Sequence, residues 1–120
     1  RGFTTMVRNA AWQVVRFVAF KQYDRAAEVL SGASAGNEWD YGRFKEALGP
    51  YWAEYDAIQI GPDARSGAQV QIEQRESAWE LTQILLDPDE HRSWHMRFTI
   101  DLDASRDAGV PVLSLQTISD

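Results

Sequence analysis

The chain has 120 residues, of which 44% are hydrophobic and none is cysteine, and its formal net charge is −6. A chain of this length fits one globular domain with one core, and the lack of cysteine excludes disulfides and thiolate metal sites. No apolar run approaches the roughly 18 residues of a membrane span, and the N-terminus lacks the layout of a signal peptide. We therefore expect one domain over residues 1–120, in a reducing cytoplasm and with no membrane partner.

The first predicted element is an amphipathic helix at the N-terminus. Apolar residues recur at intervals of three and four from Val7 to Val18, and Thr4 and Thr5 are suited to cap the helix. This spacing predicts a helix with one buried face.

The N-terminal segment is basic within an acidic protein. Residues 1–25 hold five basic residues and one acidic residue, a sum of +4, so the remaining 95 residues carry −10. Such a segment either docks on the acidic remainder of its own domain or faces a polyanion, and we favour docking. The candidate contacts for a polyanion are Arg8, Arg16, Lys21 and Arg25.

Two further helices are predicted before the sheet. A short helix covers residues 24–30 and ends in the small, turn-favouring residues of 31–37. Asp40 is a suitable cap for a third helix, whose apolar stripe runs from position 44 to position 58. The stripe keeps its phase through Gly49-Pro50, so we expect one kinked helix rather than two.

The period of the apolar residues changes from about 3.6 to 2 after Gly67, which marks the start of a sheet. Apolar and polar residues alternate from Ala68 to Glu73, from Trp79 to Leu85, from Met96 to Leu102 and from Val112 to Ile118. Turns are expected at 75–77 and at 107–109. Short connections between consecutive strands imply an antiparallel meander, and helices followed by strands imply an α+β fold with the helices on the apolar face.

The segment GPDARSG, residues 61–67, is the corner between helix and sheet. It lacks the lysine of a phosphate-binding loop and runs from helix to strand, so we interpret it as a turn in which Pro62 fixes φ and Gly67 permits a positive φ. Arg65 is left without a role in that turn. We expect Arg65 to form an ion pair with Asp63 or Asp56. The alternative is that it binds an external anion.

Carboxylates and both histidines gather in residues 87–95. Two histidines four positions apart converge on a metal when they share a helix, but this run contains Pro88 and leads into a strand that directs His95 to its polar face. We therefore expect no metal site. No set of residues meets the requirements of a nucleophile with its base, so no catalytic residue is assigned either.

Five tryptophans are many for a chain of this length. Trp79 and Trp94 share the parity of the apolar strand residues and are expected in the core, whereas Trp52 could line a pocket between helix and sheet. The residues suited to line such a pocket are Trp52, Tyr55, Arg65 and His95.

Four stretches of the sequence together resemble one family. They are TTMVRNAAW at 4–12, YWAEYDAIQIGPDARSGAQVQI at 51–72, WELTQILLDPDEHRSWHMRFTIDLDASRDAG at 79–109 and VPVLSLQTIS at 110–119. The chain is similar there to the uncharacterised C-terminal domain of actinobacterial DEAD/DEAH-box ATP-dependent RNA helicases. The similarity covers nearly all of the chain.

This resemblance implies a longer parent chain with two RecA-like motor lobes upstream, which would bind ATP and magnesium and act on RNA. No cofactor and no catalytic residue is then expected in the domain itself. The start at Arg1, without an initiator methionine, agrees with a C-terminal fragment. The order of helices and strands also looks like the cone-shaped fold of nuclear transport factor two, with helices on a curved four-stranded antiparallel sheet.

Three hypotheses follow from the sequence. The first is a non-catalytic accessory domain that tunes the helicase by contacting its RecA-like lobes, RNA or a protein partner. The second is a small-molecule-binding or enzymatic cone-fold domain with a pocket between helices and sheet, because fold alone does not decide function. The third is homodimerisation through the open face of the sheet.

Overall fold

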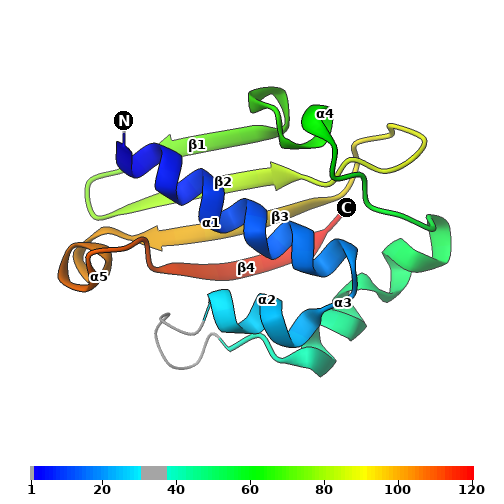
Figure 1. Cartoon of the computed structure of the whole chain (residues 1–120), viewed down its shortest axis with the longest axis horizontal. Coiled ribbons are helices and arrows are strands. Elements are labelled where there is room, and N and C mark those ends of the chain that lie inside the picture. The colour runs from blue at the N-terminus through cyan, green and yellow to red at the C-terminus, as the bar shows by residue number, and fades with distance from the viewer. Residues whose placement is uncertain (1, 31–37) are drawn as a thin grey trace.

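The computed structural model describes residues 2–30 and 38–120, and it shows helices packed on one antiparallel sheet (Figure 1). The predicted α+β class is confirmed, and the predicted order of helices before strands holds for all elements except one helix between the last two strands. The turn predicted at residues 31–37 lies outside the described residues.

The first helix, α1, spans Gly2–Ala19 and buries its apolar stripe, as predicted. It begins earlier than expected, so Thr4 and Thr5 lie inside the helix and the prediction that they cap it is wrong. The ring of Phe3 packs edge-on against Trp79 of the sheet, with centroids 5.2 Å apart. This tertiary contact favours the additional turn.

The next two helices agree closely with the sequence. α2 spans Tyr23–Val29 and α3 spans Tyr41–Glu54. The predicted cap of α3 is confirmed, because the Asp40 side chain accepts the backbone N–H of Arg43 at 2.9 Å. Pro50 lies inside α3, and one continuous helix passes through it.

The end of α3 differs from the prediction. The apolar stripe was expected to remain helical as far as Ile58, but Tyr55 is already extended, with φ −127° and ψ 154°. The Tyr51 hydroxyl donates to the carbonyl of Ala57 at 2.7 Å, which holds the departing chain against the helix. Tyr55 and Ile58 remain buried, so their role in the core is unchanged.

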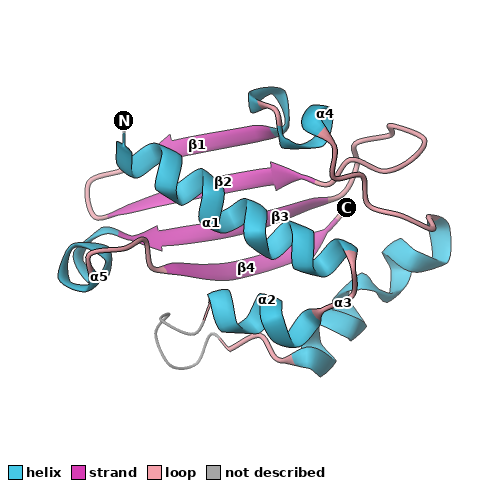
Figure 2. Ribbon diagram, in the orientation of Figure 1, coloured by secondary structure: helices cyan, strands magenta, loops and turns pink. Residues whose placement is uncertain are grey.

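Four strands form one sheet in the order β1-β2-β3-β4, and each neighbouring pair is antiparallel. The strands are β1 Val70–Gln74, β2 Ala78–Ile84, β3 His95–Asp101 and β4 Leu113–Ser119. The predicted meander is therefore confirmed. In Figure 1 and Figure 2, α1 runs diagonally across one face of the sheet, and α2 and α3 lie beyond the β4 edge.

The corner before the sheet is helical rather than a simple turn. α4 spans Pro62–Arg65, and a 3-10 turn, η1, spans Gly67–Gln69. Gly67 begins the 3-10 turn and does not adopt the positive φ that a glycine permits there. The strand also starts at Val70 rather than Ala68, because the 3-10 hydrogen bonds replace pairing there.

A further helix, α5 Leu102–Ala108, lies between β3 and β4. The sequence predicts a strand through Leu102 and only a turn at 107–109, so this element was missed. The Asp101 side chain caps the helix by accepting the N–H of Ala104 at 2.9 Å, and Gly109 ends it with φ 76°. These two capping signals override the strand-like alternation.

The two faces of the sheet differ. Met96, Phe98 and Ile100 are fully buried beneath the helices, whereas Arg97 of the same strand is exposed on the open face. The register places Thr82 and Thr117 beside Arg97, so the open face is polar there. Burial of one face drives the fold, at roughly 1.5–3 kcal/mol for each large apolar side chain.

Candidate anion-binding groove

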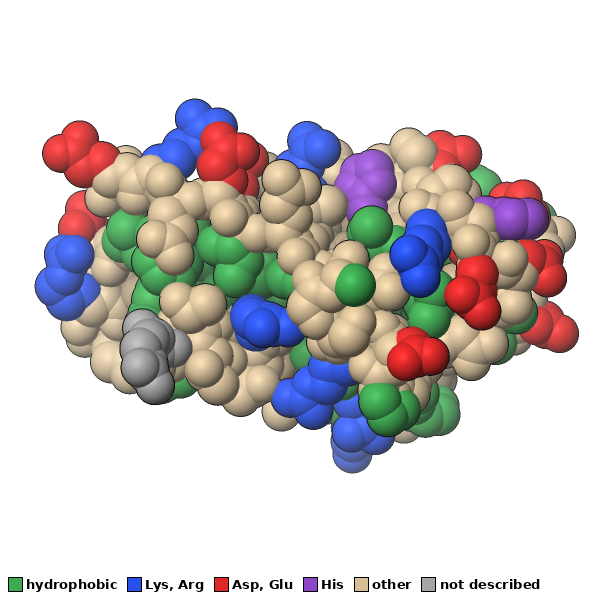
Figure 3. Space-filling model, turned by 90° about the horizontal axis from the view of Figure 1, so that it is seen from above, with side chains coloured by type: hydrophobic (Ala, Val, Ile, Leu, Met, Phe, Trp, Pro, Cys, Tyr) green, Lys and Arg blue, Asp and Glu red, His purple; other side chains and the backbone are tan. Residues whose placement is uncertain are grey.

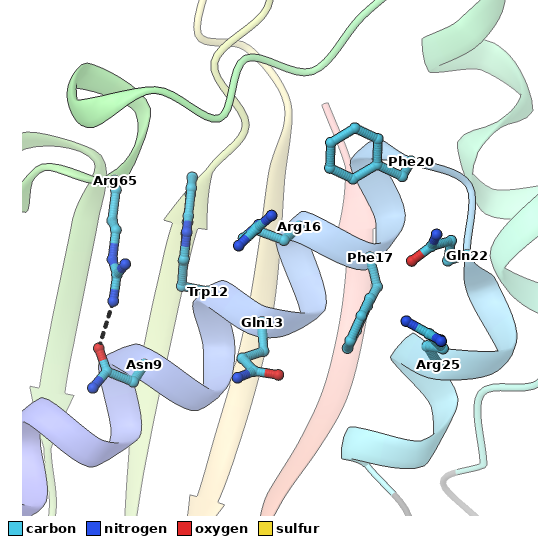
Figure 4. Close-up of a pocket in the computed structure, with 9 residues that line it drawn as sticks. All are labelled: Asn9, Trp12, Gln13, Arg16, Phe17, Phe20, Gln22, Arg25 and Arg65. Carbon is cyan, nitrogen blue, oxygen red and sulfur yellow. Dashed lines mark hydrogen bonds between the residues drawn. The ribbon is translucent and has the colours of Figure 1, made fainter.

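Three arginines from three separate elements reach into one groove of about 570 Å³ on the surface. Arg16 comes from α1, Arg25 from α2 and Arg65 from α4, and Arg16 lies between the other two (Figure 4). We call this hollow the arginine groove. The residues that line it are Asn9, Trp12, Gln13, Arg16, Phe17, Phe20, Gln22, Arg25 and Arg65.

One stripe of α1, continued by Phe20 just after the helix, forms the floor of the arginine groove. Asn9, Trp12, Arg16 and Phe20 follow one another at intervals of three, four and four, which places them on one side of a helix. Trp12 is 5% exposed and supports the polar side chains from below. The apolar stripe of α1 packs on the sheet, so Asn9, Arg16 and Phe20 face outward beside α4, above the buried Trp12.

Arg65 is held by α1 rather than by an acid. Its Nη2 donates to the side-chain oxygen of Asn9 at 2.8 Å (Figure 4). The prediction that Arg65 pairs with Asp63 or Asp56 is therefore wrong. The helical turn of α4 directs the guanidinium across to α1, and a plain turn over 61–67 does not predict this placement.

A second cavity of about 100 Å³ continues the arginine groove toward the start of α1. The two cavities share Asn9, Trp12 and Arg65, and the smaller one adds Arg8 and the side chain of Gln83. Gln83 is 2% exposed, and its amide lies 3.2–3.5 Å from three backbone carbonyls, two of them in α4 and η1. It joins the base of the groove to the corner that carries Arg65.

The charge of the arginine groove is not neutralised within the described part of the chain. The arginines that form salt bridges there are Arg75, with Glu73, and Arg106, with Asp103, and both lie elsewhere. None of the nine lining residues is acidic. In Figure 3, one group of Lys and Arg side chains lies at the lower edge of the view, while those at the upper left lie among Asp and Glu side chains, which also gather to the right.

Residues 1–118 match the sequence model of a family described as "Domain of unknown function (DUF3516)". The chain belongs to this family. No curated protein and no solved structure shows significant similarity to it. Among the described residues, no helix is long and apolar enough to cross a membrane.

The DUF3516 domain brings together three of the four predicted polyanion contacts. Arg16 and Arg25 line the groove, and Arg8 lies in its extension. Lys21 instead points to Trp52, with its Nζ 4.5 Å from the ring centroid. We expected the basic residues of the N-terminal segment to dock on the acidic remainder of the domain. Among the described residues, no salt bridge joins the two.

The predicted pocket residues lie apart, except that Arg65 belongs to the groove. The Trp52 indole donates to the Tyr23 hydroxyl at 2.9 Å, and so joins α3 to α2. The Tyr55 hydroxyl lies 2.7 Å from Nδ1 of His91 in the loop after β2. His95 begins β3 on the open face of the sheet, opposite Ser119.

Sequence reasoning missed Asn9, Phe20 and Gln83 as groove residues of the DUF3516 domain. The spacing of Asn9 and Phe20 relative to Arg16 was visible in the sequence. Their relation to Arg65 was not, because Arg65 lies 49 positions after Arg16 in the sequence.

The acidic run after β2 is a loop built around one carboxylate. Asp87 is fully buried and accepts the backbone N–H groups of Asp89, His91 and Arg92 at 3.1, 2.9 and 2.8 Å. Burial opposes ionisation, but these donors outweigh it and hold the pKa of Asp87 below its ordinary value. Within residues 2–30 and 38–120, no three carboxylates or histidines gather as a metal site.

Proposed function

We propose that this domain is a non-catalytic accessory domain of an ATP-dependent RNA helicase and that it contacts RNA phosphates through the arginine groove. The helicase context rests on the four sequence stretches that resemble such C-terminal domains. The same proposal includes a cytoplasmic parent chain, RecA-like lobes as neighbours, ATP and magnesium bound upstream, and the cone-like form of the fold.

The observation that carries the proposal is the convergence of Arg16, Arg25 and Arg65, with Arg8 close by, in a protein of net charge −6. Guanidinium groups present planar pairs of N–H donors that match phosphate oxygens. Clustered like charges without carboxylates repel one another in the free protein, and an anion would relieve that repulsion.

The composition of the groove supports binding rather than reaction. Apart from arginine, its polar side chains are amides, Asn9, Gln13 and Gln22, which supply neither a nucleophile nor a general base. The domain would then act by holding RNA near the motor. It would change the RNA dependence of the ATPase without taking part in hydrolysis.

The test uses the full helicase with Arg16, Arg25 and Arg65 each replaced by Gln, and all three together. We expect the triple variant to need more RNA for half-maximal ATPase activity while its rate without RNA stays unchanged. Each neutralised contact should lower the salt dependence of RNA affinity by about one unit of slope.

Arg75→Gln is the matched control, since it removes one exposed positive charge outside the groove. Equal RNA affinity and equal salt slope in the triple variant and in this control would contradict the proposal. Unchanged unwinding and RNA affinity after deletion of the whole domain would contradict it as well.

A second candidate function is supported by the size of the groove. About 570 Å³ lies within the range of small-molecule sites, so a small anion is the alternative ligand. Thermal stabilisation by mononucleotides or tripolyphosphate, with RNA unable to compete, would favour this alternative. Homodimerisation through the open sheet face stays a separate prediction, tested by gel filtration at several concentrations.

A further inference from the structure

We propose that the arginine groove selects single-stranded RNA and that Phe20 stacks on one of its bases. This inference rests on the proposed function, because it takes the groove as the RNA contact and adds how the strand is recognised. The feature that leads to it is an exposed aromatic ring among the arginines.

Phe20 is 56% exposed, the largest exposure among the large hydrophobic side chains in the described part of the chain. Its ring lies at one end of the arginine groove, near Arg16 (Figure 4). An aromatic ring left in water beside guanidinium groups matches the two parts of a nucleotide, a flat base and a charged phosphate. An uncharged aliphatic ligand that packed on Phe20 would form no favourable interaction with the neighbouring guanidinium groups.

The backbone holds Phe20 in place. α1 ends in a Schellman motif, in which the N–H of Gln22 bonds to the carbonyl of Phe17 at 2.8 Å and the N–H of Lys21 bonds to that of Val18 at 2.9 Å. Lys21 adopts the left-handed conformation, with φ 58°, that this motif requires. Phe20 therefore lies in a hydrogen-bonded connection between α1 and α2, which fixes the backbone position of its ring.

The spacing of the groups indicates more than one nucleotide. Phe20, directly after the end of α1, lies eleven positions beyond Asn9, which holds Arg65, and this corresponds to about 16 Å along the helix axis. A mononucleotide on Phe20 could reach Arg16 and would leave the Arg65 end unoccupied. A strand running along α1 would place successive phosphates near the arginines and one base on the ring.

A single strand fits this arrangement and a duplex does not. In a duplex, neighbouring base pairs cover the faces of each base, so only base edges and the backbone are accessible to protein. Stacking on Phe20 requires a base whose face is free. The Phe20 ring should therefore distinguish single-stranded RNA from duplex RNA, and the arginines should bind the phosphates of the strand.

The test measures anisotropy of labelled oligoadenylate, hairpin RNA, an abasic oligomer and inorganic polyphosphate with the 120-residue chain. We expect Phe20→Ala to weaken oligoadenylate binding about five- to thirtyfold, in line with loss of one stacked base. Phe20→Tyr should bind as wild type, and Phe20→Leu should be as weak as Phe20→Ala. Polyphosphate affinity and the salt slope should not change in any Phe20 variant.

Val110→Ala is the matched control, because Val110 is 53% exposed and lies outside the groove. Melting curves of each variant verify that it is folded. The inference is overturned if Phe20→Ala leaves oligoadenylate binding unchanged, or if hairpin RNA or the abasic oligomer binds as tightly as oligoadenylate.

The two proposals can fail separately. If the Arg16, Arg25 and Arg65 variants weaken RNA binding while Phe20→Ala does not, the groove is an RNA-phosphate site and only the stacking inference is lost. If the arginine variants leave RNA binding unchanged, the proposed function itself is wrong.

Discussion

At the scale of single residues, Asp87 is a buried carboxylate whose hydrogen-bond donors are backbone N–H groups. The loop it anchors contains two left-handed residues, Glu90 at φ 57° and Arg92 at φ 58°. Such backbone conformations are unfavourable for residues other than glycine, so the loop depends on the bonds that Asp87 accepts.

Asp87→Asn should destabilise the domain by about 1–3 kcal/mol at pH 7, because an amide has one acceptor oxygen and presents N–H groups to other N–H groups. The measurement is chemical denaturation as a function of pH. The pKa of Asp87 is lower in the folded state than in the unfolded state, so its contribution is complete above the unfolded value of about 3.9 and is lost as the pH falls toward the folded value. The difference between wild type and variant should shrink with acidification in that range. A constant difference would contradict this account.

At the scale of elements, the corner between α1 and α2 places Lys21 where glycine is common. The side chain compensates by lying over Trp52, with Nζ 4.5 Å from the ring centroid. A cation over an aromatic ring contributes about 0.5–1 kcal/mol at exposed sites, comparable to the cost of the left-handed backbone.

Lys21→Ala should therefore be less stable than Lys21→Gly by about 1 kcal/mol, since both lose the contact with Trp52 but only alanine keeps the backbone cost. Thermal denaturation of the two variants measures this difference directly. The ordinary trend in a helix interior is the reverse, so a more stable alanine variant would show that the corner is not constrained in this way.

Much of the element order could be predicted because it depends on local periodicity. The stripe of α1 and the alternation in β2 and β3 follow from which residues are buried. α5 and α4 were missed because short helices are decided by capping, by Asp101 and Gly109 in one case and by the proline at the start of α4 in the other. The alternation of apolar and polar residues through Leu102 predicted a strand where α5 begins.

At the scale of the whole molecule, only part of the candidate site was predictable from the sequence. The excess of positive charge in residues 1–25 indicated Arg8, Arg16 and Arg25. The contribution of Arg65 depends on how α4 lies against α1, which no local pattern encodes. The sequence thus shows that positive charge is concentrated in residues 1–25. Only the fold brings these arginines and Arg65 together in one groove.

A groove that keeps several positive charges together should not be optimal for stability. Replacing both Arg16 and Arg25 by Gln should leave the melting temperature equal to that of wild type or higher at low salt, because like charges are removed and no salt bridge among the described residues is lost. The difference should fall as salt is raised. A loss of more than about 1 kcal/mol would mean that the arginines are structural, which would weaken their assignment to a ligand.

The hydrogen bond from Arg65 to Asn9 has one further consequence. A free arginine side chain samples many rotamers and carries about 2 kcal/mol of rotational entropy. Folding has already restricted Arg65, and four N–H donors of its guanidinium remain beyond the one given to Asn9. An oxyanion that binds Arg65 would therefore find a side chain whose orientation is already restricted by its hydrogen bond to Asn9. Binding would then cost little additional conformational entropy.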